Sequence, residues 1–363
     1  MTQTLAPTAP TAAGFHPLTV AAVQRLTDDA VAVTFEVPDV LRAAFAFDAG
    51  QSLTLRRVVD GVEERRSYSI CARVGERPRI GVREIPDGLF SRWLVRDVRP
   101  GDVVEVQPPS GSFRADAALL RSARRHLCIA AGSGITPTLS IAASALEEGA
   151  EATLLYGNRT TASVMFAEEL ADLKDAHPDR FDLVHVLSRE PRDVDLLSGR
   201  LDADRLRTLL PLLVPLDDLD HAWLCGPLAM TTTAHDVLVE LGVAPERIHR
   251  ELFFVDEPPP ELHHLDALVE GVTTEATVVL DGRSTTHAVP RDRPLLDSAQ
   301  QHRGDLPFAC KGGVCGTCRA HLVSGEVDMV RNYALEPAEV DAGFVLTCQT
   351  YPVGDAVTVD FDA

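Results

Sequence analysis

The spacing of hydrophobic and polar positions changes twice along the chain, and each change marks the start of a different kind of domain. In the first block, residues 17–115, short apolar runs are separated by Gly, Asp and Pro turn signals. Several short strands at close spacing are typical of a small antiparallel barrel or sandwich. We expect strands at residues 30–37, 52–59, 64–70, 79–85 and 102–107, and one helix at residues 88–95.

The second block, residues 116–254, alternates buried apolar runs with segments of helical period. Pro137 opens the first predicted helix and Gly149 follows its end, which is typical of helix limits. Alternating strands and helices predict an α/β doubly wound parallel sheet. We expect strands at residues 126–131, 152–156, 181–187, 221–225 and 248–252, and helices at residues 137–148, 163–176, 203–213 and 229–241.

A Pro-rich segment separates this block from a third one. Pro258, Pro259 and Pro260 are consecutive, and such a run joins neither helix nor sheet, so residues 255–273 are predicted to be a linker. Residues 274–363 then predict a small α+β domain. Its expected elements are a hairpin (275–280 and 284–289) around Asp281-Gly282, a helix (294–302) and strands at 319–323 and 356–361.

Composition and charge exclude several classes of protein. The 363 residues carry 54 acidic and 34 basic side chains, a net charge of −20, which repels nucleic-acid backbones. No run of about 18 apolar residues occurs, so no membrane span is predicted. Residues 1–16 lack the basic and apolar segments of a signal peptide and predict a disordered N-terminal tail. We therefore expect a cytoplasmic protein.

Four of the seven cysteines follow an unusual spacing. Cys310, Cys315 and Cys318 form C-x4-C-x2-C, and Cys348 follows alone. Disulfides, a zinc ion and an iron–sulfur cluster are the alternatives. A reducing cytosol disfavours disulfides, and zinc ribbons usually supply two C-x2-C pairs. Plant-type ferredoxins hold a 2Fe–2S cluster with the spacing seen here. The sequence therefore favours a 2Fe–2S cluster, with Gly312, Gly313 and Gly316 expected at positive φ.

Other motifs indicate nucleotide binding. Gly132-Ser-Gly134 follows a predicted strand and opens a helix, where backbone N–H groups bind a pyrophosphate. Cys225-Gly226 ends a later strand of the same sheet, so both motifs are expected at its carboxyl edge. In the first block, Arg66-Ser-Tyr68-Ser places a guanidinium and a ring on one strand face. Each motif is weak alone, because a tight turn or a solvated arginine explains it equally well.

Taken together and in this order, the motifs resemble the ferredoxin–NADP reductase superfamily, fused to a plant-type ferredoxin. The resemblance implies an antiparallel β-barrel flavin domain, an α/β nucleotide domain and an α+β β-grasp ferredoxin-like domain. It implies that FAD is bound by the Arg66–Ser69 strand. There Arg66 would hold the pyrophosphate, Tyr68 would pack on the isoalloxazine and Ser69 would approach its N5. The remaining FAD contacts implied are Ser67, Val82 along the ribityl chain, and Gly88, Phe90 and Ser91 at the phosphates.

The resemblance also assigns residues to the pyridine nucleotide and to hydride transfer. Its implied nucleotide cradle is Gly132, Gly134 and Thr136, with Cys225 and Gly226 beside the nicotinamide. Glu251 is implied near the hydride path, and Phe253, with Phe254 as the alternative, over the other face of the flavin.

Two basic positions bear on the choice of nucleotide. Arg159 follows the second strand of the sheet, and Ser188-Arg189 follows the third. An arginine beside the ribose accommodates a 2′-phosphate, whereas an acidic residue there favours NAD. The sequence thus favours NADPH over NADH, although solvated surface arginines are the simpler alternative.

A finer resemblance covers nearly the entire chain. Tyr-Gly-Asn-Arg (156–159) with Ser-Val-Met-Phe (163–166), Cys-Lys-Gly-Gly-Val-Cys (310–315), Asn-Tyr-Ala-Leu-Glu-Pro (332–337) and Val-Leu-Thr-Cys-Gln (345–349) resemble the reductase subunits of ring 1,2-phenylacetyl-CoA epoxidases. That family implies electron transfer from NADPH through FAD and the cluster to the subunits of a separate di-iron oxygenase, in aerobic phenylacetate degradation. Reductases of Rieske-type steroid or aromatic hydroxylases share the architecture.

Two further hypotheses concern what the chain does by itself. Glu-x-x-His occurs at residues 246–249 and 261–264, but a di-iron site needs two such pairs on facing helices. One pair precedes a predicted strand and the other falls in the linker, so the oxygen chemistry is assigned to a partner. From another class, a non-catalytic zinc-stapled binding module would use the same fold without redox chemistry.

Overall fold

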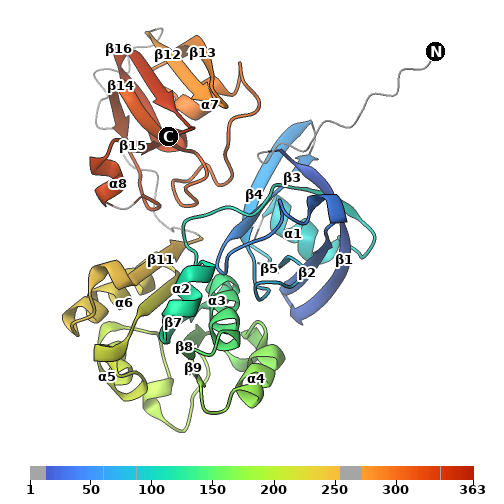
Figure 1. Cartoon of the computed structure of the whole chain (residues 1–363), viewed down its shortest axis with the longest axis vertical. Helices are drawn as coiled ribbons and strands as arrows, with labels where there is room; N and C mark the ends of the chain where they lie inside the picture. The colour runs from blue at the N-terminus through green and yellow to red at the C-terminus, as the bar shows by residue number, and fades with distance from the viewer. Residues whose placement is uncertain (1–13, 60, 87, 254–271, 336) are drawn as a thin grey trace. The chain divides into compact units, whose positions relative to one another are not determined.

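The computed structural model describes residues 14–363 except 60, 87, 254–271 and 336 (Figure 1). The chain forms two compact units. The first comprises the described residues up to Cys225 together with Thr232–His249, and the second comprises Gly226–Thr231 and the described part of Arg250–Ala363. Most of the predicted tail and linker lies outside the described residues. At the tail's end, however, a strand already begins at His16.

The N-terminal part of the first unit is an antiparallel sheet in the order β4-β3-β6-β1-β2-β5. An isolated bridge between Ile70 and Ile80 joins its two edges, so the sheet curls into a barrel. The barrel core includes Phe35, Leu53 and Leu55, all fully buried. Helix α1 (Leu89–Arg96) packs against β2 and β5. The strands are β1 (His16–Thr27), β2 (Ala30–Glu36), β3 (Ser52–Val59), β4 (Val62–Ser69), β5 (Arg79–Arg83) and β6 (Val103–Val106).

The predicted barrel is confirmed, but the long strand β1 was not foreseen. Its residues alternate irregularly between buried and exposed, and the register with β2 shifts between Val20 and Ala22 and again between Arg25 and Thr27. Bulges of this kind break the period-2 pattern from which a strand is predicted.

The second sheet of this unit has the order β11-β10-β7-β8-β9, and the pairs β10–β7, β7–β8 and β8–β9 are parallel. This confirms the doubly wound α/β prediction. Its strands are β7 (Arg125–Ala131), β8 (Glu151–Asn158), β9 (Phe181–Leu187), β10 (His221–Gly226) and β11 (Ile248–Leu252). The helices are α2 (Ala117–Ser122), α3 (Ile135–Glu147), α4 (Ala167–Ala176), α5 (Ala203–Leu213) and α6 (Leu228–Glu240).

Two helix starts differ from the prediction. Helix α4 begins at Ala167 and not at residue 163, because Phe166 has a left-handed backbone with φ 59°. The segment Thr161–Ser163 forms a separate 3₁₀ turn, closed by a reciprocal cap between Thr160 and Ser163. Helix α3 begins at Ile135, so Pro137 is its third residue and not its first.

The barrel and the parallel sheet meet in a close joint within the first unit. A Cβ added to Gly81 in β5 would lie 2.5 Å from Thr136 Cγ2 and 3.0 Å from the Phe166 ring. The Ser140 hydroxyl of α3 donates a 2.6 Å hydrogen bond to the Ala72 carbonyl, which the barrel supplies. Only glycine fits at position 81, and the joint therefore holds β5 directly against the start of α3.

The second unit contains a mixed sheet in the order β13-β12-β16-β14-β15. Strands β12 and β16 are parallel, and the pairs β12–β13, β14–β15 and β14–β16 are antiparallel. Its strands are β12 (Thr273–Leu280), β13 (Arg283–Pro290), β14 (Arg319–Met329), β15 (Phe344–Leu346) and β16 (Thr350–Asp360), and its helices are α7 (Leu295–Ala299) and α8 (Pro337–Asp341). Helix α7 packs on β12, β13 and β16, which confirms the α+β prediction.

The hairpin turn of this unit follows its sequence. Asp281 and Gly282 have φ of 52° and 67°, the pair of positive values that a type I′ turn requires. Strands β14 and β16 are longer than expected: β14 runs on to Met329 and β16 begins at Thr350, and their pairing continues across two register shifts.

Candidate functional site

The glycine turn after β7 lies at the carboxyl edge of the parallel sheet. Gly132 has φ 56°, whereas Gly134 has φ −60° and already belongs to the helical turn. The Tyr156 hydroxyl donates to the Gly132 carbonyl at 2.9 Å, and the Thr136 hydroxyl donates to the Ser133 carbonyl at 3.0 Å. These bonds fix the turn in a shape in which the N-terminus of α3 opens on the sheet edge, as a pyrophosphate site needs.

An arginine that sequence reasoning missed lies at this turn. Arg83 ends β5, and its Nη2 donates to the Ser163 carbonyl at 2.6 Å. Its Nη1 would lie 3.3 Å from a Cβ at Gly132, and its Nε is 3.4 Å from an oxygen of Asp29. The barrel thus contributes a positive charge beside the glycine turn. Nothing in the local pattern around residue 83 indicates this, because its neighbours come from distant segments.

The loops after β8 and β9 are joined to each other. The Ser188 N–H donates to the Asn158 carbonyl at 2.9 Å, and the Arg189 N–H donates to the Arg159 carbonyl at 2.8 Å. Both oxygens of Glu190 accept hydrogen bonds from Thr161 at 2.7 Å. The structure therefore brings the predicted 2′-phosphate residues together on adjacent loops.

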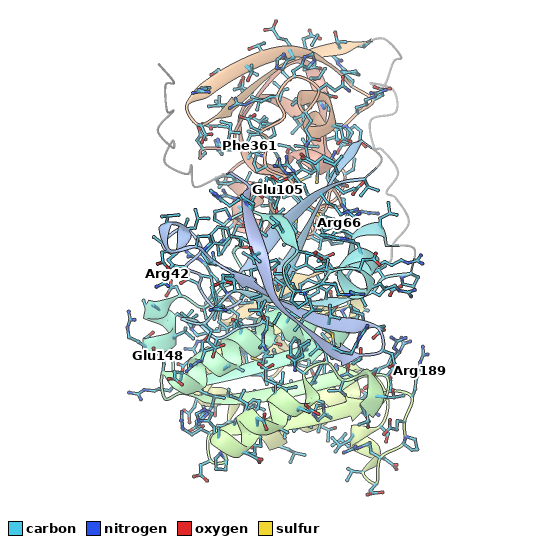
Figure 2. The ribbon with its side chains drawn as sticks, turned by 90° about the vertical axis from the view of Figure 1, so that its right-hand side faces the viewer. Arg42, Arg66, Glu105, Glu148, Arg189 and Phe361 are labelled. Atoms are coloured by element: carbon cyan, nitrogen blue, oxygen red, sulfur yellow. The ribbon has the colours of Figure 1, made fainter. Side chains whose placement is uncertain are left out.

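The side chains of these loops differ in their surroundings. The Arg159 side chain is 54% exposed, and its Nη2 lies 3.8 Å from Asp29 Oδ2. Arg189 is exposed and projects from the molecule (Figure 2). The buried amide of Asn158 has no hydrogen-bond partner among the described residues. Polar atoms left in this state are costly, so a ligand contact would stabilise them.

The predicted flavin residues line β4. Arg66 is paired with Glu64 at 2.9 Å and its side chain is 47% exposed. Tyr68 lies against Phe90, with ring centroids 6.1 Å apart, and burial raises the pKa of its hydroxyl. Ser69 is buried, and the Ser67 hydroxyl shares a 3.0 Å hydrogen bond with Thr54. Arg66 is thus accessible to an anion, while Tyr68 keeps a neutral ring for stacking.

The start of α1 is a compact turn. The Ser91 hydroxyl accepts the Ile85 N–H at 3.1 Å, and a Cβ at Gly88 would lie 2.6 Å from that hydroxyl oxygen. Gly88 is therefore required for the close approach, and Ser91 keeps its own proton to donate. Val82 is 1% exposed in the barrel core. The contact predicted for it with a ribityl chain would therefore have to be made by its backbone.

The residues predicted near the nicotinamide fall at the ends of strands. Cys225 is buried near the end of β10, opposite Ala130 of β7, and Gly226 ends the strand. Glu251 lies in β11, and Phe253 follows it with 38% of its surface exposed. These last two belong to the second compact unit, and their roles beside the flavin stay predictions. Phe254 lies outside the described residues.

The four cysteines of the predicted cluster come together as two pairs. A hydrogen bond from the Cys315 thiol lowers the pKa of Cys310 to about 5, and holding that proton raises the pKa of Cys315. In the same way, the bond from Cys318 lowers the pKa of Cys348, and that of Cys318 is raised. Two thiolate pairs are the donor set for two irons, each taking two sulfurs.

Backbone amides of the cysteine loop face these sulfurs. The Gly312 N–H donates to Cys310 Sγ at 3.3 Å, and further N–H groups of Val314 and Cys315 help to lower the pKa of Cys310. The Gly313 amide does the same for Cys348. An environment that stabilises sulfur anions fits an iron–sulfur cluster, whose properties depend on such hydrogen bonds.

One prediction about this loop is wrong. Positive φ occurs at Gly313 (76°) and Gly316 (67°), as expected, but the third such residue is Lys311 (52°) and not Gly312. Lys311 tolerates this conformation because its ammonium binds Asp297 and Gln300, both at 2.8 Å, on and just after α7. Tertiary hydrogen bonds thus offset the cost of a left-handed lysine.

The Glu-x-x-His pairs do not form a di-iron site in the described part of the chain. Glu246 lies in a 3₁₀ turn and His249 in β11, and the second pair falls outside the described residues. Among the described residues, no three His, Cys, Asp or Glu side chains gather closely enough to hold one metal ion, and no helix is long and apolar enough to cross a membrane.

Comparison with known families identifies all three parts of the chain. Residues 17–115 match the oxidoreductase FAD-binding domain, residues 128–236 match the oxidoreductase NAD-binding domain, and residues 278–353 match the 2Fe-2S iron-sulfur cluster binding domain. The cluster match decides against the zinc alternative. The fold and sites thus define an oxidoreductase with FAD-binding, NAD-binding and 2Fe–2S domains in one chain.

Relatives extend over the full length. The chain is 43% identical to the E subunit of 1,2-phenylacetyl-CoA epoxidase from Escherichia coli, over 96% of this chain and 98% of the relative. It is 35% identical to the ferredoxin reductase component of 3-ketosteroid-9-alpha-monooxygenase from Rhodococcus rhodochrous, over 95% and 96% of the two chains. The chain belongs to the oxygenase-reductase family that contains these two proteins.

A solved structure has the same architecture. Phthalate dioxygenase reductase, described as a modular structure for electron transfer from pyridine nucleotides to [2Fe-2S], aligns with a TM-score of 0.60 at 25% identity. The alignment covers 96% of this chain and 98% of that one.

Proposed function

We propose that this protein is the reductase component of a phenylacetyl-CoA epoxidase, carrying electrons from NADPH through FAD and the 2Fe–2S cluster to a separate di-iron oxygenase. The observation that carries the proposal is the likeness along the whole chain to the E subunit of the Escherichia coli epoxidase. FAD, when bound, accepts a hydride and releases its electrons singly, and the cluster takes one electron at a time.

The barrel residues hold and orient the flavin in this proposal. Arg66, already exposed, would exchange Glu64 for the flavin pyrophosphate in a charge-assisted contact. Gly88, Phe90 and Ser91 receive the phosphates at the start of α1, where backbone N–H groups favour anions. Tyr68 would pack against the isoalloxazine, and Ser69 would approach its N5.

The carboxyl edge of the parallel sheet binds the nucleotide. The Gly132 turn, Gly134 and Thr136 receive the pyrophosphate, with Arg83 as an additional cation. Ser188, Arg159 and Arg189, on the joined loops after β8 and β9, bind the 2′-phosphate. Cys225 is the residue of the parallel sheet expected beside the nicotinamide, and the roles of Gly226, Glu251 and Phe253 in hydride transfer rest on the family likeness alone. NADPH is the favoured donor because each of the two joined loops carries an arginine, Arg159 and Arg189.

The cysteine loop supplies Cys310, Cys315, Cys318 and Cys348 as ligands. Its amide N–H groups stabilise the sulfur charges and so tune the ease of reduction. Thiolate ligands persist in a reducing compartment, which supports a cytoplasmic location for the protein.

A second candidate is the reductase component of a Rieske-type steroid or aromatic hydroxylase. The 35% identity to the 3-ketosteroid-9-alpha-monooxygenase component favours it. Both candidates use the same internal electron path and differ only in the oxygenase served.

One reconstitution separates the candidates. Purified holoprotein and NADPH are mixed with the di-iron subunits of a phenylacetyl-CoA epoxidase or with a Rieske-type steroid hydroxylase, and product formation is measured. We expect epoxide formation coupled to NADPH oxidation only in the first mixture. Turnover in the second mixture alone would replace the proposal by the second candidate, and a preparation without flavin or iron–sulfur absorbance would reject both.

A further inference from the structure

The turn between β1 and β2 brings an acidic side chain to the nucleotide edge. Asp29 Oδ1 lies 3.4 Å from Arg83 Nε, and its Oδ2 lies 3.8 Å from Arg159 Nη2. The Asp29 side chain is 42% exposed. One carboxylate of the barrel therefore neutralises two cations that belong to the proposed NADPH site.

The position of this carboxylate is set by the fold. The Thr27 hydroxyl donates to Asp29 Oδ1 at 2.7 Å, and the Glu84 N–H donates to the Asp29 carbonyl at 2.7 Å. The first bond orients the side chain and the second attaches the turn to β5. Asp28, in the same turn, is exposed, and the Arg25 guanidinium reaches only its backbone carbonyl, at 3.3 Å. The two adjacent aspartates thus differ in what they face.

The charges around Asp29 come from three segments. Arg83 extends from β5 and also binds the Ser163 carbonyl. Arg159 extends from the loop after β8, whose backbone is tied to Arg189. Glu190, the acidic residue of the neighbouring loop, is engaged by Thr161. Asp29 is therefore the carboxylate that faces Arg159.

We propose that Asp29 is a specificity-determining residue that lowers the preference for NADPH over NADH. The proposal rests on the proposed function, in which Arg159 binds the 2′-phosphate. A 2′-phosphate on Arg159 must displace Asp29 and then lies close to a like charge, which weakens its binding. A ribose 2′-hydroxyl carries no charge and donates a hydrogen bond to such a carboxylate, as an acidic residue does in NAD sites. The barrel and the loop after β8 thus act on nucleotide choice in opposite directions.

The test uses ligands that carry only the adenosine end. Calorimetric titration of the holoprotein gives its affinity for 2′,5′-ADP and for 5′-AMP, two ligands that differ only in the 2′-phosphate. Asp29→Asn keeps the size of the side chain and an oxygen that accepts the Thr27 hydrogen bond. We expect it to tighten the binding of 2′,5′-ADP by about five- to tenfold and that of 5′-AMP, whose phosphate reaches only Arg83, by a clearly smaller factor. Asp28→Asn removes one negative charge from the neighbouring residue and should change neither affinity.

Separate results address the inference and the function beneath it. Arg159→Gln should weaken the binding of 2′,5′-ADP. In that background Asp29→Asn should change this affinity much less, because the cation for which the Asp29 carboxylate competes with the 2′-phosphate is gone. If Arg159→Gln weakens 2′,5′-ADP but Asp29→Asn leaves it unchanged, the inference about Asp29 fails and the NADPH assignment stands. If Arg159→Gln has no effect on 2′,5′-ADP, the NADPH assignment itself fails.

A structural role for Asp29 gives a different pattern. A variant that loosens the β1–β2 turn would change the affinities for 2′,5′-ADP and for 5′-AMP by the same factor, and it would lower the melting temperature. That pattern would overturn the inference. Asp29→Ser is the second variant, since it removes the charge by a different side chain, and selective tightening of 2′,5′-ADP in both variants would support the charge mechanism.

Discussion

The cluster site and the nucleotide site are built from the chain in different ways. Cys310, Cys315 and Cys318 lie within nine residues, and their loop carries the amides that face the sulfurs. The nucleotide edge collects side chains from the barrel and from the loops after β7, β8 and β9. A site drawn mostly from one short stretch, as three of the four cysteines are, is visible in the sequence, and we expect it to fail when one ligand is removed. A dispersed site depends on the joint between two sheets and responds to changes by degrees.

The largest expected effect is the loss of the iron–sulfur cluster on substitution of a single cysteine. Cys315→Ser should abolish the 2Fe–2S cluster and electron delivery to the oxygenase, because one of four ligands is lost. Flavin binding and NADPH-dependent ferricyanide reduction should remain, since neither needs the cluster. Absorption spectra and coupled oxygenase turnover are the measurements. Cys128→Ala, at a buried thiol far from the loop in sequence, should keep the cluster. Wild-type oxygenase turnover by Cys315→Ser would contradict the proposed electron route.

The second effect concerns two charges of the dispersed site. Replacing Arg159 and Arg189 together by Gln should lower kcat/KM for NADPH by at least about tenfold, given about 1.5–3 kcal/mol for each charge-assisted contact. The value for NADH should change little, because it lacks the 2′-phosphate. Steady-state ferricyanide reduction with each nucleotide provides the ratio. A matched pair of exposed arginines elsewhere in the first unit, Arg42 and Arg121, should leave that ratio unchanged. Equal losses for both nucleotides would reject the assignment.

The third effect is a difference between the two compact units in how their stability depends on pH. His126, His221 and His249 cluster with Trp223, which stacks on His249 at 4.1 Å and donates to His126 Nδ1 at 3.2 Å. Burial lowers the pKa of His126 and of His249 to about 4, and it also lowers the pKa of His221.

The sign of the pH effect follows from these shifts. An unfolded histidine titrates near pH 6.5, so between pH 6.5 and 4 the unfolded chain binds more protons. The stability that the neutral histidines contribute is complete above about pH 6.5 and falls toward pH 4, by about 1–2 kcal/mol at pH 5 for each of His126 and His249. Calorimetry should show the first unit losing stability before the second. His249→Gln should flatten that slope and His177→Gln should not, and a slope unchanged in His249→Gln would contradict the account.

The smallest expected effect is at the joint between the two sheets of the first unit. Gly81→Ala places a Cβ at 2.5 Å from Thr136 Cγ2, so β5 or the start of α3 must move, at a cost of about 1–3 kcal/mol. We expect a lower melting temperature and a higher KM for NADPH, with an unchanged iron–sulfur spectrum. Gly304→Ala, where a Cβ meets no atom within 4 Å, is the matched control. An unaltered KM and melting temperature would show that the joint does not position the nucleotide turn.

The sequence alone determined the fold class and predicted the cluster ligands. The order of strand-like and alternating segments, the Gly132 turn and the cysteine spacing each depend on neighbours close in sequence, and local backbone preferences act at that range. The Asp281-Gly282 turn was predicted for the same reason, since both residues tolerate positive φ.

Other features were decided only by tertiary structure. Helix α4 starts at Ala167 because Phe166 is held in a left-handed conformation, and Lys311 takes the φ expected of Gly312 because α7 and its next residue bind its ammonium. Arg83 and Asp29 carry no motif. They meet Gly132 and Arg159 only because β5 packs on the start of α3, through contacts between residues far apart in sequence. Such contacts depend on how two folded sheets fit together, and no local pattern of residues records that fit.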